Sequence, residues 1–146
     1  MARFFTRAEA AAWGGFLTTH GRLSKRIEEN LRRAAGLSHA EYEVLLRLYR
    51  EKDGRLRIQD LAARSVLTHS GTSRLIDRLE RAGRVTRADA EEDGRGAYAV
   101  LTESGREHFL QAARQHTAFV KEIFLSRFSA DELEVMGSFW ARLEDS

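Results

Sequence analysis

Two short amphipathic stretches separated by a few residues constrain the fold of this chain more than any other feature. Residues 70–82 carry apolar side chains on one helical face and Ser and Arg side chains on the opposite face, which predicts an amphipathic helix. Just upstream, the spacing of Ile58, Leu61 and Ala62 predicts a shorter helix, and residues 65–68 leave only a tight connection between the two. Two short helices joined in this way form a helix-turn-helix.

The polar face of the second predicted helix has the chemistry of a DNA-reading surface. A DNA major groove admits one α-helix and is read by hydrogen bonds from side chains near the helix N-terminus. Arg can hold O6 and N7 of guanine, and Ser hydroxyls can bond base edges or phosphates. The candidate DNA-contacting residues on this helix are His69, Ser70, Ser73, Arg74 and Arg78. A solvated helix face is the alternative interpretation, since charge-rich outer faces are common.

A Gly-rich polar segment between two predicted strands follows this helix. Gly83 lies where a helix commonly ends, and residues 85–88 and 97–101 have the composition of short strands. A hairpin directly after a recognition helix is the wing of a winged helix-turn-helix. Leu56 and Ile58 predict a short third strand that pairs with the wing.

Three motifs carry a resemblance to a known family: LSHAEYEVLLRLY, RIQDLAARSVLTHSGTSRLIDRLERAGRVTR and EEDGRGAYAVLTESGRE. Over about residues 37–107 they resemble the multiple antibiotic resistance regulator (MarR) family of bacterial transcription factors. The DxR of the wing (Asp93, Arg95) and the LTxxGR after it fall at the family's spacing. The resemblance implies that Arg95 reaches an adjacent minor groove and that Asp93 holds the wing in shape by pairing with a nearby Arg.

Positive charge is concentrated around the predicted helix-turn-helix. The formal net charge of the 146 residues is only +2, which does not by itself indicate a nucleic-acid partner. Between positions 55 and 87, however, eight Arg residues accompany three acidic residues. We therefore predict that Ser70, Ser73 and Arg74 read bases and that Arg78 and Arg64 contact phosphates. Thr72, within the same stretch, is predicted to face the core.

Long amphipathic helices are predicted on both sides of this region. Apolar residues recur at helical spacing over residues 7–35 and 103–128, and Ser129 with Glu132 begins a last helix. Because a minimal winged helix contains neither terminal segment, their apolar faces must be buried elsewhere, and a second copy of the chain provides a partner. The predicted fold is mainly α, with a winged helix-turn-helix core, a two- to three-stranded wing sheet and flanking dimerisation helices. The predicted DNA-binding region is residues 37–102. The predicted dimerisation segments are residues 1–36 and 103–146.

This organisation predicts a homodimeric, sequence-specific regulator of transcription, in the first instance a repressor. A two-fold dimer presents its recognition helices to successive major grooves, so the operator should be a pseudo-palindrome with half-sites about 10 base pairs apart. A winged-helix module that binds protein in place of DNA is the alternative from another class.

An aromatic stripe on the helix predicted over residues 7–35 is a candidate effector site. Trp13, Phe16 and His20 share one face of this helix. They are within reach in principle of Tyr42 or Tyr49 on the next helix, which a capping box of Ser38 and Glu41 is predicted to begin. Members of the resembled family commonly bind phenolic or other aromatic acids in a cleft between the dimerisation helices and the winged helix, so the resemblance implies release from DNA by such a molecule. The alternative is that these aromatic residues are ordinary core.

Other classes of function have little support in the sequence. The absence of cysteine removes disulfides, thiolate metal sites and thiol redox sensing. The five histidines form no HxH or HxxxH pair, so no metal or cofactor is assigned. A zinc-responsive regulator is kept only as an alternative. No catalytic motif indicates an enzyme. The lack of a signal-peptide core and of a long apolar run predicts a cytoplasmic protein without a membrane segment.

Overall fold

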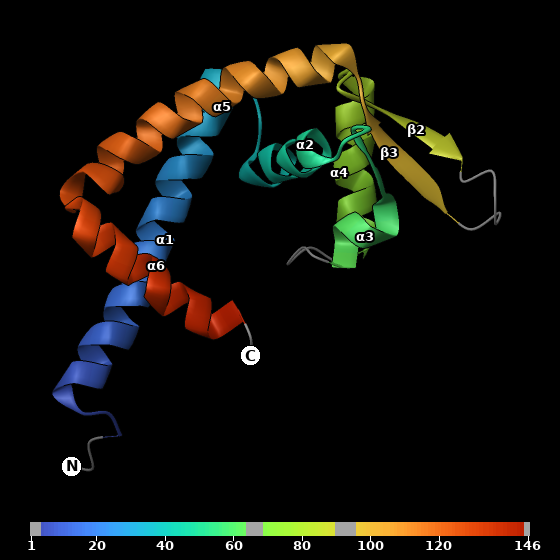
Figure 1. The fold of residues 1–146 in the computed structure, drawn as a ribbon. Helices are drawn as coiled ribbons and strands as arrows, with labels where there is room; N and C mark the ends of the chain where they lie inside the picture. Colours follow the sequence, from blue (N-terminus) through green and yellow to red (C-terminus); the bar gives the residue numbers. More distant parts are fainter. Residues whose placement is uncertain (1–3, 64–68, 90–95, 145–146) are drawn as a thin grey trace.

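A winged helix-turn-helix lobe and a limb of long helices make up the computed structural model, which describes residues 4–63, 69–89 and 96–144 (Figure 1). The elements are α1 (Arg7–Ala35), α2 (His39–Arg50), β1 (Arg55–Arg57), α3 (Ile58–Ala63), α4 (His69–Arg81), β2 (Val85–Asp89), β3 (Ala97–Leu101), α5 (Glu103–Ile123), the 3-10 helix η1 (Leu125–Arg127) and α6 (Ala130–Glu144). The lobe contains α2 to α4 and the sheet, and the limb contains α1, α6 and most of α5.

Local capping explains where the first two helices begin and end. Thr6 and Glu9 form a capping box at the start of α1, and Gly36 ends it in the left-handed conformation, at φ 67°. Ser38 and Glu41 form a second capping box at the start of α2. These boundaries confirm the helix predicted over residues 7–35 and the capping box predicted after it.

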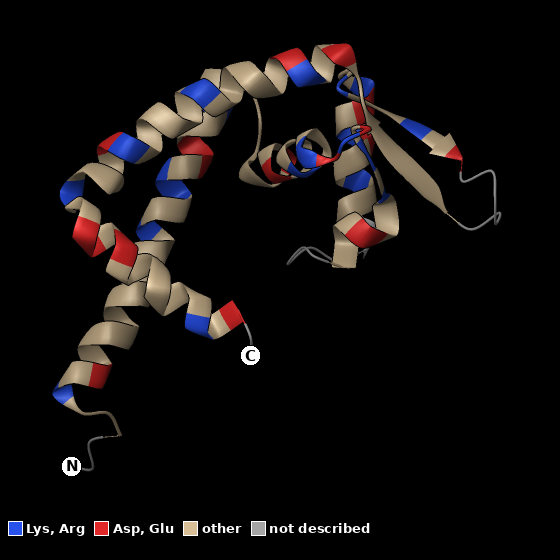
Figure 2. Cartoon of the chain, viewed as in Figure 1, with Lys and Arg blue, Asp and Glu red and all other residues tan. Residues whose placement is uncertain are grey.

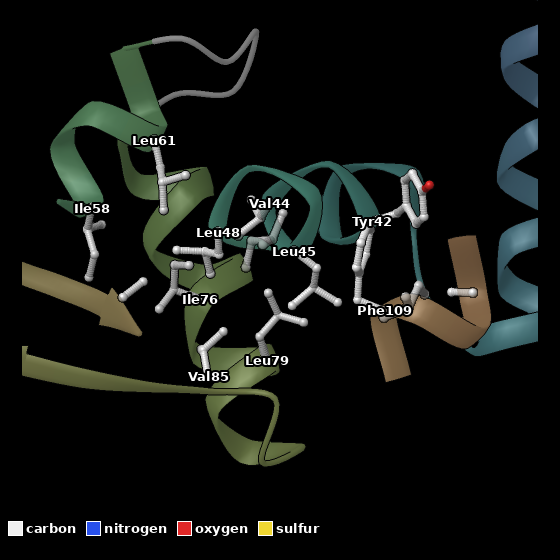
Figure 3. Packing of buried hydrophobic residues seen from close by; sticks show 14 of the residues in the cluster. Tyr42, Val44, Leu45, Leu48, Ile58, Leu61, Ile76, Leu79, Val85 and Phe109 are labelled. Carbon is white, nitrogen blue, oxygen red and sulfur yellow. The ribbon is translucent and has the colours of Figure 1, made fainter. Parts of the chain in front are cut away.

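The core of the lobe forms where α2, α3 and α4 pack against one another and against the sheet (Figure 3). Leu45, Leu61 and Ile76 contribute one side chain from each helix, and all three are fully buried. Thr72 is also buried, at 1% exposure, which confirms that it faces the core. The apolar face of α4 is therefore committed to the core, and its polar face is left outside.

The sheet is antiparallel, in the order β1-β3-β2. β2 and β3 form the predicted wing hairpin, with Val85 opposite Leu101. β1 pairs with β3 and confirms the predicted third strand, although its position was predicted one residue too late. Ile58 starts α3 instead, where its side chain is buried in the core.

The start of α5 is joined closely to the end of α4. The Thr102 hydroxyl accepts the Gly105 N–H at 2.9 Å and donates to the Gly83 carbonyl at 2.7 Å. A Cβ on Gly105 would lie 2.0 Å from the Arg84 carbonyl oxygen, so only glycine fits there. This contact explains why the LTxxGR motif has a glycine at that place.

The C-terminal part of the chain bends earlier than the apolar pattern predicts. α5 ends at Ile123 rather than near residue 128, because Phe124 leaves helical geometry at φ −132° and ψ −63°. η1 follows, and a capping box of Ser129 and Glu132 begins α6 as predicted. The bend lets α6 cross α1 (Figure 1). In the described ranges, no helix combines the length and apolarity that crossing a membrane requires.

Candidate nucleic-acid interface

α4 presents a basic, polar surface because its apolar side chains are all used by the core. Leu75, Ile76 and Leu79 are buried, whereas Arg74 and Arg78 are exposed on the opposite side. Ser73 is half-buried beside them. Figure 2 shows the basic positions of α4 beside the wing strands. The geometry therefore leaves Ser73 and Arg74 accessible to a molecule that approaches the first half of α4.

Several predicted contact residues fall at the limits of the described structure. His69 and Ser70 form the first turn of α4 by their backbone, which is the position predicted for base reading. Arg64, Asp93 and Arg95 lie outside the described residues. The predicted roles of Arg64, Asp93 and Arg95 in phosphate contact and in the wing therefore stay predictions.

Arg78 is engaged within the chain rather than simply projecting toward solvent. Its Nε donates to Oε1 of Glu41 at 3.0 Å, and the Glu41 side chain is only 12% exposed. The other Glu41 oxygen accepts the Ser38 N–H at 2.9 Å. One carboxylate thus caps α2 and holds α4, and a phosphate contact by Arg78 would compete with this ion pair.

Arg87 of β2 is a structural residue of the interface that the sequence did not single out. Its Nη1 lies 2.6 Å from Oδ1 of Asp77 and 3.2 Å from Oε1 of Glu80, and its Nη2 donates to the Ser73 carbonyl at 3.3 Å. The side chain is 30% exposed, so solvent only partly screens these ion pairs. Arg87 ties the wing sheet to α4 and so helps to fix the angle between the two elements. The only sequence signal was an excess of Arg in this region, which does not identify the partners.

The predicted effector residues do not all come together in the chain. The rings of Trp13 and Phe16 stack at 5.9 Å, those of Phe16 and His20 at 6.0 Å, and Trp140 of α6 joins Phe16 at 5.7 Å. Tyr42 lies elsewhere. It is 5% exposed, in the core of the lobe. Since a helix rises about 1.5 Å per residue, Trp13 lies roughly 30 Å from the end of α1 that leads into α2. The expected reach from the aromatic stripe to Tyr42 was therefore wrong for a single chain.

Tyr42 belongs instead to a titratable cluster between α2 and α5. Its ring lies 4.7 Å from that of His116, centre to centre, and His116 lies 6.4 Å from His39. Nε2 of His39 is 3.6 Å from Oε1 of Glu43. Hydrogen bonding to Glu43 raises the pKa of His39 despite partial burial, and the same bond lowers the pKa of Glu43. Burial and the neighbouring charge of His39 lower the pKa of His116.

The zinc alternative finds no site in the part of the chain that the structure describes. There, no three His, Asp or Glu side chains are grouped so that they could hold a metal ion. The cluster of His39, Glu43 and His116 consists of an ion pair between His39 and Glu43 and a ring contact between His39 and His116.

Comparisons with known proteins agree with this geometry. The sequence profile of the MarR family matches residues 35–96. AbsC, a MarR family transcriptional regulator from Streptomyces coelicolor, is 31% identical and superposes with a TM-score of 0.90, over 99% of this chain and 97% of AbsC. Sco3205, another MarR family regulator of that organism, was solved in complex with DNA; it is 28% identical, with a TM-score of 0.91 over 99% of this chain and 91% of Sco3205.

A curated relative points the same way. The HTH-type transcriptional repressor YetL of Bacillus subtilis (strain 168) is 30% identical over 112 residues, which cover 74% of this chain and 66% of YetL. The winged helix-turn-helix, the polar face of α4 and these likenesses together show that the chain belongs to the MarR family of DNA-binding transcriptional regulators.

Proposed function

We propose that the chain acts as a homodimeric repressor that binds a pseudo-palindromic operator through α4 and the wing. The observation that carries this proposal is the orientation of α4, which buries its apolar face in the lobe and leaves Ser73 and Arg74 outside. A repressor is favoured over an activator by the name of the relative YetL. A chromosomal target implies that the protein works in the cytoplasm.

Dimerisation is supported by large apolar side chains left exposed on the limb. Trp13 of α1 is 54% exposed, and Trp140 and Leu143 of α6 are 46% and 65% exposed. An apolar groove of about 410 Å³ runs along α6, with Val135 and Phe139 in its lining. Contiguous apolar surface of this kind indicates a protein interface. A second copy of the limb would cover it and place two lobes side by side, which supports residues 1–36 and 103–146 as dimerisation segments.

The DNA contacts are proposed to divide by kind. Ser70, Ser73 and Arg74 read base edges, and His69 also faces the DNA. Arg78 and Arg64 contact phosphates. Arg95 reaches the minor groove from a wing that Asp93 holds in shape. For Arg78, binding of a phosphate requires Glu41 to release or share the guanidinium. Glu41→Gln would remove that competition, so we expect it to strengthen binding to operator and random DNA by the same factor. A loss of affinity would count against a phosphate role for Arg78.

Footprinting of the purified protein on the DNA upstream of its own gene tests the proposal. We expect protection of an inverted repeat with half-sites about 10 base pairs apart, centre to centre. A regulator that works by contacting another protein would give no protected repeat at moderate salt. Placing the protected repeat over a reporter promoter then distinguishes repression from activation.

We also propose that a small aromatic acid releases the protein from DNA. The ladder of Trp13, Phe16 and His20 supports this, because it offers ring faces for stacking and ends on an imidazole that can hydrogen-bond. Tyr42 is left out of this site because it lies in the core of the lobe. The effector must bind the DNA-incompetent spacing of the two lobes more tightly than the competent one.

A thermal-shift screen of aromatic acids, repeated on Trp13→Ala, separates an effector site from a purely dimeric surface. A true effector stabilises the wild-type dimer, stabilises Trp13→Ala less and lowers operator affinity. Gel filtration of Trp13→Ala serves as the control that dimerisation persists. A compound that stabilises both proteins equally would place its site away from Trp13. One that leaves operator affinity unchanged would not be an effector.

A further inference from the structure

One tyrosine and two arginines form a stack on the wing sheet. Arg57 of β1 is directly opposite Tyr98 of β3, and its Cζ lies 5.2 Å from the centre of the tyrosine ring. Arg55, two residues earlier and therefore on the same face of β1, has its Cζ 4.0 Å from that ring. A guanidinium is attracted to the face of an aromatic ring. Tyr98 therefore holds two positive side chains in defined positions.

Of these two arginines, only Arg57 also lines a hollow between α4 and the base of the wing. The hollow measures about 250 Å³. Ser73 of α4 forms one side of it, and Gly96, next to the wing loop, forms another. Arg55 is not part of its lining. The two arginines thus share the same aromatic support but differ in what their side chains face.

Arg87 lines the same hollow, and its guanidinium is bonded to α4. Asp77 and Glu80 both pair with its Nη1, and the Ser73 carbonyl accepts from its Nη2. These bonds fix the wall of the hollow by tying β2 to α4. Arg87 therefore holds two walls of the hollow together, and Arg57 brings a second guanidinium to it.

In the DNA-binding mode proposed above, the hollow lies where a strand of DNA crosses the protein. With α4 in a major groove and the wing at the adjacent minor groove, the sugar-phosphate strand between the two grooves passes between α4 and the wing. We propose that a phosphate of this strand binds at the hollow through Arg57, and that Tyr98 is a positioning residue that keeps Arg57 there. This proposal rests on the DNA-binding mode proposed above. It adds a contact that sets the register of the protein on DNA without reading sequence.

The test compares Arg57→Gln with Arg55→Gln, a matched control on the same strand and against the same ring. Binding to operator and to random DNA is titrated over a range of salt concentrations. We expect Arg57→Gln to weaken both by the same factor and to reduce the slope of log K against log salt by about 0.9 per protomer. Arg55→Gln should leave the slope unchanged. An unchanged slope for Arg57→Gln, or an equal reduction for Arg55→Gln, would overturn the proposal.

The role of Tyr98 is tested by two replacements of its ring. Tyr98→Phe keeps the aromatic face and should keep the wild-type slope, whereas Tyr98→Leu should reduce it toward that of Arg57→Gln. If Tyr98→Leu binds as the wild type does, Tyr98 does not position Arg57. Melting temperatures of all variants check that the fold is retained.

Ethylation interference on the wild-type protein needs no variant. Ethylating the phosphates between the major groove and the adjacent minor groove of each half-site should block binding, and binding that tolerates ethylation there would overturn the proposal. The two levels of failure can be told apart. If the wild type shows no salt-dependent DNA binding, the proposed function fails; if it binds and only the Arg57 results differ, this inference alone fails.

Discussion

The arginine side chains of α4 differ in their interactions within the chain. Arg78 is paired with Glu41, and Arg81 donates weakly to the Asp77 carbonyl at 3.4 Å. Arg74, one turn nearer the N-terminus, is exposed on the face that the core leaves free. The side chains near the start of a recognition helix reach base edges, and those farther along reach the backbone. Base discrimination is therefore expected to depend on Arg74.

We predict that Arg74→Ala lowers operator affinity much more than affinity for random DNA. A bidentate contact to guanine contributes about 1–3 kcal/mol of discrimination, which the variant would lose. Arg81→Ala, on the last turn of the same helix, is the matched control and should keep the preference. Competition titrations give the ratio of the two affinities. Equal losses of Arg74→Ala on both DNAs would assign Arg74 to the backbone.

Gly105 is the residue at which a single added methyl group should matter most for folding. A Cβ there would lie 2.0 Å from a backbone oxygen of Arg84, so α5 or the start of β2 must move. Overpacking of this kind costs about 1–3 kcal/mol, and we expect Gly105→Ala to lower the free energy of unfolding by that amount in urea titrations. Gly21→Ala is the control, because a Cβ at Gly21 meets nothing within 4 Å. Equal stabilities for the two variants would contradict the close contact.

At the level of elements, the junction of α2 and α5 connects the winged helix-turn-helix lobe to the limb. His39 and Tyr42 come from α2 and His116 from α5, and Glu28 of α1 accepts the His39 backbone N–H at 2.7 Å. Nδ1 of His116 is buried without a hydrogen-bond partner. Placing a proton on His116 would add a second positive charge next to His39. This junction is therefore the part of the molecule whose packing should respond most to mild acid.

We predict that His116→Gln makes stability less sensitive to pH in mild acid. The pKa of His116 is lowered in the fold, so its contribution is complete above the ordinary histidine pKa of about 6.5 and is lost as the pH falls through the lowered pKa. Gln cannot be protonated, so that loss should disappear. His39 acts in the opposite sense: its pKa is raised, so its contribution is complete below about 6.5 and fades as the pH rises through the raised value.

Urea titrations of the wild type and His116→Gln between pH 7.5 and 5 measure this difference, a range chosen to bracket the histidine pKa of about 6.5. His39→Gln is the companion variant, and it should remove the opposing trend. If the free energy of unfolding changes with pH in parallel for the wild type and His116→Gln, protonation of His116 does not destabilise the junction.

The sequence predicted the elements well where the determining interactions are local. Ser38 with Glu41 and Thr102 with Gly105 act over three residues, so the helix starts were readable. The end of α5 was not, because the apolar period continues through Phe124 while the backbone turns there. Contacts between residues far apart in the sequence could not be predicted either. Arg78 and Glu41 are 37 positions apart, and nothing in the pattern of either helix indicates their contact.

At the level of the whole molecule, the limb leaves apolar side chains exposed that a partner surface would bury. α5 joins the lobe to the limb, and α6 crosses α1 so that Trp140 packs on Phe16 (Figure 1). Both of these rings still remain substantially exposed. The sequence indicated the apolar faces but not their meeting, because that depends on the bend after α5. A dimer would bury these faces and also fix the distance between the two copies of α4.

We predict that Trp140→Asp converts the dimer to monomers at low protein concentration. Aromatic anchors at the centre of an interface often contribute 2 kcal/mol or more, so the dimer dissociation constant should rise by roughly thirty-fold or more. Sedimentation velocity over a concentration series measures the change, with Gln115→Asp on the exposed side of α5 as the control. An unchanged dissociation constant would move the interface away from the crossing of α1 and α6.

Dependence on the spacing of the two half-sites is the most direct test that two copies of α4 act together. Successive major grooves on one side of DNA are about 10 base pairs apart, and inserting 5 base pairs turns the second half-site to the opposite side. On the footprinted operator, we predict that the 5-base-pair insertion reduces the affinity to that of an isolated half-site. A 10-base-pair insertion also reduces the affinity, but it keeps both half-sites on the same side of the DNA. Equal affinities for the native and the 5-base-pair-inserted operators would contradict a rigid dimer that reads two grooves at once.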